Sequence, residues 1–322
     1  MTVISSPPAL PAGPRAPAPG PPRRRRPGIG GPRTLISPER LRSRRGRAVY
    51  FAVLAATTVV FLLVFFFPLY WMITGAVKHP TELAQPTPTL YPHTFHPESY
   101  VEAWERLSIA HYFVNTVFYA VGGWLFQLVF DVAAAYALSR LRPVLGSLVL
   151  GMMLATLMLP ASALLVPAYL TVADVPVVHV NLLNTPWALW LPGVANAFNI
   201  YLLKRFFDQI PHELIDAASI DGAGRLRVLV SIVLPLSRPV LGVVSIFIII
   251  AGWKDFLWPL LVLPDPEAQT LSVALSRLSM TSQVALNELM AGLVIASVPM
   301  VLVFLIFQRS ILGGLSAGSL KG

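Results

Sequence analysis

Residues 213–239, ELIDAASIDGAGRLRVLVSIVLPLSRP, form a polar, helix-patterned stretch between two long apolar segments. The first part, residues 213–220, favours a short helix with the carboxyl groups of Glu213 and Asp216 near its positively polarised amino end. Gly222 then allows a turn, because glycine reaches a positive φ at little cost. The stretch therefore predicts a helix-turn-helix connecting the two apolar segments.

One face of the first predicted helix is suited to contact with another protein. Leu214, Ala217 and Ala218 share a face by the i, i+3, i+4 spacing, and the small alanines allow a close approach. A second helix is expected over residues 226–234. We expect Pro235 to end it, because proline removes a backbone hydrogen bond from the helix.

The composition of the 322-residue chain indicates a membrane protein. Only 12% of its residues are charged and 55% are hydrophobic, whereas soluble proteins carry about 25% charged residues. Five charge-free stretches are each as long as the roughly 20 residues that a helix needs to cross a bilayer. They run from Arg47 to Lys78, Arg106 to Asp131, Arg142 to Asp174, Asp174 to Lys204, and Glu288 to Arg309.

A sixth apolar stretch, residues 240–263, is interrupted by Lys254 and Asp255. Backbone groups in lipid must be paired within a helix or a closed barrel. The sequence therefore predicts an all-α membrane protein with six transmembrane helices. We expect these spans at residues 50–73, 113–137, 148–170, 186–203, 240–263 and 291–307.

The distribution of basic residues predicts the orientation. With both termini in the cytoplasm, only Lys78, Arg106, Lys254 and Arg277 of the 24 Lys and Arg residues lie outside, as the positive-inside rule requires. The helix-turn-helix then lies on the cytoplasmic side, between spans four and five. The net charge of +9 reflects this topology, and nucleic acid is not an expected partner.

Residues 1–47 are rich in Pro, Ala, Gly and Arg, a composition that cannot bury enough apolar surface to fold. We expect a disordered cytoplasmic tail and not a cleaved signal. The arginines of this tail can also bind anionic lipid headgroups. Residues 48–322 are expected to form the transmembrane domain.

The helix-turn-helix resembles the "EAA" coupling loop of ABC-importer permeases. The matching pieces are Asp216-Ala217-Ala218, Asp221-Gly222-Ala223 and Leu234-Pro235-Leu236, with Asp216 where that family usually has Glu. Residues 48–322 as a whole resemble the second permease of carbohydrate, maltose-type, binding-protein-dependent importers. Further matching pieces are Tyr112–Thr116, Ala134–Arg140, Leu183–Thr185, Gly252–Phe256 and Gly314–Gly318.

The resemblance implies a second permease subunit, two cytoplasmic ATPase subunits, an extracytoplasmic solute-binding protein and a location in the plasma (inner) membrane. It also implies two sets of residues that contact the ATPase. The coupling set is Glu213, Leu214, Asp216, Ala217, Ala218, Asp221, Gly222 and Ala223; the tail set is Gly314, Ser316 and Gly318. The sequence contains no G-x-x-x-x-G-K-[ST] phosphate loop, so ATP hydrolysis is expected from the partners.

Asp131 is a carboxylate within a predicted span. An ionisable residue inside a membrane is costly, so its presence indicates a functional role by default. It can relay protons, as in a secondary transporter, or serve as a paired structural group near the end of the span. We expect no second buried acid or histidine beside it, which favours the structural interpretation.

The outer part of the fifth span suggests a substrate path. Aromatic and hydrogen-bonding side chains suit a sugar, although Trp also belongs at membrane interfaces. The candidates are Asn115, Trp253, Lys254, Asp255 and Phe256.

We expect no catalytic residue, metal or cofactor in this chain. His212-Glu213 lacks the second histidine of a zinc-protease helix, and the chain has no cysteine. The expected function is a non-catalytic permease subunit of an importer for a sugar or oligosaccharide. Alternatives are another solute, such as a polyol phosphate or peptide, and a proton-coupled secondary transporter that uses Asp131.

Overall fold

The computed structural model describes residues 43–280 and 284–319, with side chains to residue 308. The chain divides into two units at Val64/Phe65. The described part of the first unit is the amino-terminal portion of helix α2 (Arg44–Ala76). The end of α2 and the remaining helices belong to the second unit. The tail predicted at residues 1–47 lies mostly outside the described residues.

The described residues are mostly helical, and an isolated bridge between Val175 and Val180 is their one trace of extended pairing. Three helices are long and apolar enough to cross a bilayer, and two bent helix pairs bring the number to five. The long helices are α2, α5 (Ile109–Tyr136), which continues as the π-helix η1 (Ala137–Leu141), and α16 (Leu286–Ser319). The described residues thus contain three to five candidate spans, all of them helical.

The third expected span is broken more sharply than a proline kink. It consists of α6 (Gly146–Thr156) and α7 (Ala161–Ala173), bent by 108°. The break lies at Pro160, which cannot donate a backbone hydrogen bond, whereas Pro167 lies within α7.

The fourth expected span is not one helix, so that part of the prediction is wrong. Helix α8 (Pro186–Trp190) ends early, and α9 (Ala197–Asp208) begins only after Asn196. The side chain of Asn196 accepts a hydrogen bond from the backbone N–H of Asn199 at 3.1 Å. This N-cap supplies a partner for a free backbone group and makes a new helix start possible inside the apolar segment.

The expected helix end at Pro235 is also wrong. Helix α11 (Arg225–Val228) continues through the π-helix η2 (Leu229–Val233) into α12 (Leu234–Leu236). At the end of η2 the N–H of Leu234 donates to the carbonyl of Leu229, five residues earlier. This π-helical turn shifts the register of the backbone hydrogen bonds just before Pro235. The bend, 84°, comes at Ser237, before α13 (Arg238–Lys254).

Shorter helices lie between the long ones. They are α3 (Pro80–Leu83), α4 (Glu98–Arg106), α10 (His212–Ile220), α14 (Leu257–Val262), the 3-10 helix η3 (Pro266–Ala268) and α15 (Leu271–Ser279). Leu271 and Leu275 both lie buried on α15.

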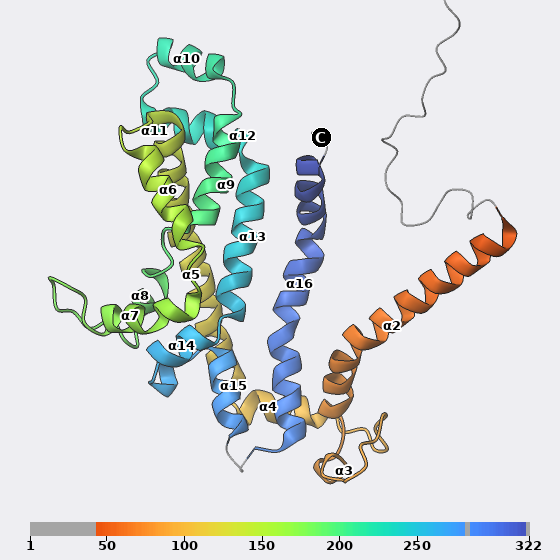
Figure 1. Cartoon of the computed structure of the whole chain (residues 1–322). Coiled ribbons are helices and arrows are strands. Elements are labelled where there is room, and N and C mark those ends of the chain that lie inside the picture. The colour runs from red at the N-terminus through yellow and green to blue at the C-terminus, as the bar shows by residue number, and fades with distance from the viewer. Residues whose placement is uncertain (1–42, 281–283, 320–322) are drawn as a thin grey trace, which may run out of the picture. The chain divides into compact units, whose positions relative to one another are not determined.

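Two apolar cores lie at opposite ends of the second unit. One joins α5, α9, η2 and α13 and includes Phe207 and Val233; the other joins α4, α15 and α16 and includes Leu107 and Leu275. Figure 1 shows α10 beyond the first core, at the end toward which α16 runs, with α4 and α15 at the other end.

Candidate functional site

Helix α10 begins after Pro211 and ends in a turn that depends on one glycine. Gly222 has φ +80°, and the backbone N–H groups of Ala223 and Gly222 donate to the carbonyls of Ala218 and Ser219 at 2.9 and 3.1 Å. These two bonds form a Schellman motif, which requires a left-handed residue at the position of Gly222. The predicted helix and glycine turn are therefore confirmed.

The faces of α10 differ from the expectation in one respect. Ile215 and Ala218 pack against the core, whereas Leu214, Ala217 and Ile220 are exposed. Ala218 thus lies on the inner face, because the turn after α10 folds the chain back at that point. Among its described residues α10 buries none, and Ile220 is 86% exposed. The helix therefore offers an apolar outer surface that its own chain leaves uncovered.

Arg140 in η1 holds the α10 segment at its entry, and Tyr136 at the end of α5 holds it at its exit. Arg140 donates from Nη2 to the carbonyl of Phe207 and, at 2.7 Å, to that of Ile210, and its Nη1 lies 3.3 Å from Nδ1 of His212. The hydroxyl of Tyr136 donates to the carbonyl of Arg225 at 3.1 Å. Both ends of the α10 segment are thus tied to α5.

A second polar cluster lies beside this entry point. The hydroxyl of Ser139 donates to Asp208 Oδ1 at 2.7 Å, and Lys204 Nζ donates to Oδ2 at 2.8 Å. Burial alone raises the pKa of Asp208, but these bonds outweigh it and the pKa lies below its ordinary value. The ionised carboxylate therefore links α9 to η1.

We expect Arg140→Met to loosen α10 within an otherwise folded chain. Hydrogen bonds from charged donors contribute about 1.5–3 kcal/mol each, and the change removes two bonds to carbonyls at the entry. Limited trypsin cleavage after Arg225 and Arg227, which are both exposed, should become about tenfold faster or more.

Arg142→Met is the matched control, because it also removes one trypsin site. The side chain of Arg142 donates from Nε only to the carbonyl of Ser139, at 3.3 Å, among its described hydrogen bonds. Equal cleavage of the two variants would show that Arg140 does not anchor the segment.

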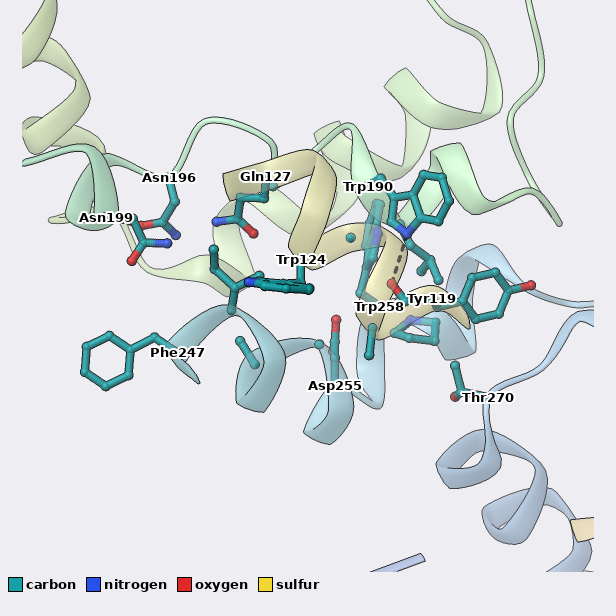
Figure 2. Close-up of a pocket in the computed structure, with 18 of the residues that line it drawn as sticks. Tyr119, Trp124, Gln127, Trp190, Asn196, Asn199, Phe247, Asp255, Trp258 and Thr270 are labelled. Atoms are coloured by element: carbon teal, nitrogen blue, oxygen red, sulfur yellow. Dashed lines mark hydrogen bonds between the residues drawn. The ribbon is translucent and has the colours of Figure 1, made fainter. Parts of the chain in front are cut away.

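A cavity with a volume of about 590 Å³ lies midway along the helices. Helices α5, α8, α9, α13 and α14 contribute its walls, which combine aromatic and amide side chains (Figure 2). The polar and aromatic lining residues are Tyr119, Trp124, Gln127, Trp190, Asn196, Phe198, Asn199, Phe247, Asp255, Trp258 and Thr270.

Asp131 is not a lining residue, but it accepts hydrogen bonds from three residues that are. Its Oδ1 accepts from the backbone N–H of Asn196 at 3.0 Å, and its Oδ2 accepts from Asn199 Nδ2 at 3.2 Å and Gln127 Nε2 at 3.4 Å. The side chain is fully buried. Asp131 therefore ties the interrupted fourth segment to α5 at the start of α9.

The residues expected along the substrate path separate in the structure. Asp255 lines the cavity. Asn115 donates to the carbonyls of Glu267 and Gln269 at 2.8 and 3.1 Å, and Trp253 donates to that of Ala296 at 3.3 Å. Lys254 and Phe256 are exposed and are not among the lining residues.

The backbone of the expected tail contacts, Gly314, Ser316 and Gly318, belongs to α16. The side chains there lie outside the described residues. Their contact with an ATPase remains a prediction.

Most of the lining residues were missed at the level of sequence. A signal was present on α5, because Trp124, Gln127 and Asp131 follow one another at spacings of three and four and so share a helix face. The contributions of α8 and α9 were hidden, because the segment was interpreted as one apolar span.

The described residues contain no group of three or more His, Asp or Glu side chains that could hold a metal ion. The site therefore consists of an exposed helix and a cavity without a metal-binding cluster in the described part of the chain.

Comparison with known proteins identifies the family. Residues 127–315, which include Gln127 of the cavity wall, all of α10 and most of α16, match the family described as binding-protein-dependent transport system inner membrane component. The chain belongs to this family. It is accordingly a transport subunit of an inner membrane.

Relatives that align with most of the chain are permease proteins, in agreement with this family. One is the probable ABC transporter permease protein YurM of Bacillus subtilis, 31% identical over 82% of this chain and 86% of its own. Another is the melibiose/raffinose/stachyose import permease protein MelC of the same species, 30% identical over 80% of this chain and 92% of its own.

The fold of this permease also matches a solved structure. A chain of a bacterial ABC transporter involved in the import of the acidic polysaccharide alginate superposes with a TM-score of 0.72, at 24% identity, over 83% of this chain and 98% of its own. At that identity the match establishes the fold alone.

Proposed function

We propose that this permease is the six-span, non-catalytic subunit of an ATP-driven importer for a sugar or oligosaccharide, and that α10 is the helix through which ATPase subunits drive it. The observation that carries the proposal is the exposed apolar face of α10, held at both ends by α5. Membership of a family of binding-protein-dependent transport components supports it.

The expected partners follow from the same proposal. They are a second permease, two cytoplasmic ATPase subunits and an extracytoplasmic solute-binding protein. A sugar is the proposed cargo because MelC is named for the import of melibiose, raffinose and stachyose. Both termini are proposed to lie in the cytoplasm, on the side of α10, and this places the basic residues inside.

The contacts of α10 give the proposal a mechanical basis. A partner that pushes on Leu214, Ala217, Ile220 and the turn at Asp221–Ala223 moves a helix whose inner residues, Ile215 and Ala218, touch the core. The Arg140 and Tyr136 tethers then pass the motion to α5, which forms one wall of the cavity. The proposed contact surface also includes Glu213 and Asp216, which place two carboxylates in the first half of α10.

A proton-coupled mechanism through Asp131 receives less support. Asp131 accepts three described hydrogen bonds, from Gln127, the backbone of Asn196 and Asn199, and they hold the start of α9 against α5. A carboxylate used in this way serves as a structural acceptor. We therefore propose that transport is driven by ATP.

Purification of the tagged chain from its native membranes tests the proposal. We expect a second permease and a subunit carrying a phosphate-binding loop to co-purify in stoichiometric amounts. ATP hydrolysis by the complex should rise several-fold when its solute-binding protein is added with solute. A chain that purifies alone and transports solute in response to a proton gradient would contradict the proposal.

A further inference from the structure

We propose that the 590 Å³ cavity is a saccharide-binding site within this subunit and that it selects uncharged sugar units over phosphorylated or acidic ones. The proposal rests on the proposed function. It adds where the sugar is held and which chemical class is accepted. A volume within the range of about 300–1,000 Å³ is typical of small-molecule sites.

The charges around the cavity favour a neutral ligand. In the described part of the chain the lining includes one carboxylate, Asp255, and no Lys, Arg or His. A second carboxylate, Asp131, lies directly behind Gln127, Asn196 and Asn199. A phosphate or uronate would enter without a cationic partner and beside like charges, and an unpaired charge in such a site is costly.

The aromatic walls suit the apolar faces of sugar rings. Five aromatic residues from α5, α8, α13 and α14 line the cavity: Tyr119, Trp124, Trp190, Phe247 and Trp258. Figure 2 shows Trp124, Trp190 and Trp258 near the middle of the view, with Phe247 and Tyr119 toward its two sides. Rigid aromatic rings provide a large contact area, and Tyr and Trp add a polar tip.

The position of Trp190 is set by the backbone of α5. Its Nε1 donates to the carbonyl of Tyr119 at 3.0 Å. A Cβ added at Gly122 would lie 2.3 Å from Cζ2 of Trp190. Glycine at this position therefore lets the indole pack directly against α5, so that this wall exists before any ligand binds.

The polar groups provide both donors and acceptors, as hydroxyl groups require. Asp131 holds the side-chain NH2 groups of Gln127 and Asn199, so their carbonyl oxygens face away from it and can accept from a hydroxyl. Nε1 of Trp124 is shielded from solvent and has no hydrogen-bond partner among the described residues. Because solvent does not reach this donor, a ligand oxygen contacts it only after the indole turns further into the cavity.

The test uses the importer complex purified from native membranes and a defined set of probes. The neutral probes are maltotriose, raffinose, cellotriose and N,N′,N″-triacetylchitotriose; the anionic probes are trigalacturonate and glycerol 3-phosphate. The complex, without its solute-binding protein, is incubated with all six probes at equal concentration, and retained probes are measured by mass spectrometry. We expect retention from the neutral set only.

Variants assign the retained probe to the cavity. Trp190→Ala should reduce retention roughly tenfold, and Gly122→Ala, which displaces Trp190 without removing it, should reduce it in the same direction. Trp187→Ala is the matched control, because Trp187 packs on Phe126 and Trp190 but is not a lining residue. It should retain the probe as the wild type does.

Retention of an anionic probe, retention of no probe, or equal retention by the Trp190→Ala and Trp187→Ala variants would overturn the proposal. Failure of the proposed function gives a different result, since no ATPase subunit would then co-purify. The two failures are therefore distinguishable in one preparation.

Discussion

Gly222→Val is expected to disconnect this permease from its ATPase while leaving the chain inserted in the membrane. Gly222 has φ +80°, and a Cβ placed there would meet no described atom within 4 Å. The penalty is thus one of backbone conformation, about 1–2 kcal/mol for a left-handed residue, and more for a β-branched one. The Schellman bonds that close α10 should open, and the exposed face of α10 should change direction.

The measurement is the amount of ATPase subunit that co-purifies with the tagged chain, together with ATP-driven uptake. We expect both to fall about tenfold or more, given the strain of about 1–2 kcal/mol. Gly224→Val is the matched control, because Gly224 has φ −68° and ψ 163° and equally open surroundings, a conformation that valine favours. Equal behaviour of the two variants would remove the role assigned to the turn.

Asp131→Leu is expected to destabilise the protein more than any surface change. Leucine leaves the Asn196 N–H and the side-chain NH2 groups of Asn199 and Gln127 without their acceptor. Each unsatisfied buried group costs about 1–3 kcal/mol, so the loss of several kcal/mol should detach the start of α9 from α5. The midpoint of thermal unfolding in detergent should fall by several degrees.

Asp131→Asn separates structure from proton transport. Asparagine keeps one acceptor oxygen, so the unfolding midpoint should lie between those of the wild type and the leucine variant, and uptake should remain largely intact. If the asparagine variant is as stable as the wild type but its uptake no longer responds to a proton gradient, Asp131 is a proton carrier and not a tether.

The local features of α10 were predictable because they depend on neighbouring residues. Glycine at position 222 and the helix pattern before it specify a helix and its terminating turn without help from the rest of the chain. The packing of Ala218 against the core was not predictable from the sequence, because it depends on where the core lies relative to α10.

The breaks within the apolar segments were harder to predict, since an apolar composition does not distinguish one helix from two. Asn196 acts as an N-cap inside such a segment, and η2 shifts the hydrogen-bond register so that Pro235 stays within a helix. Both depend on local pairing that hydropathy does not report.

The cavity depends on contacts between distant segments. Gln127, Asn199 and Asp255 come from α5, α9 and the α13–α14 junction and meet only after folding. The motif Ala134–Arg140 was recognised, but the reason for it, two tethers on the α10 segment, required the structure.

Cross-linking from α10 tests the central claim most directly. The chain contains no cysteine, so Ala217→Cys creates a single attachment point for a photo-crosslinker on the exposed face of α10, in the otherwise native complex. Ser279→Cys, exposed on α15 at the other end of the second unit (Figure 1), is the control. We predict that position 217 cross-links to the subunit that binds ATP and that position 279 does not. Cross-linking of both positions to that subunit, or of neither, would contradict the account.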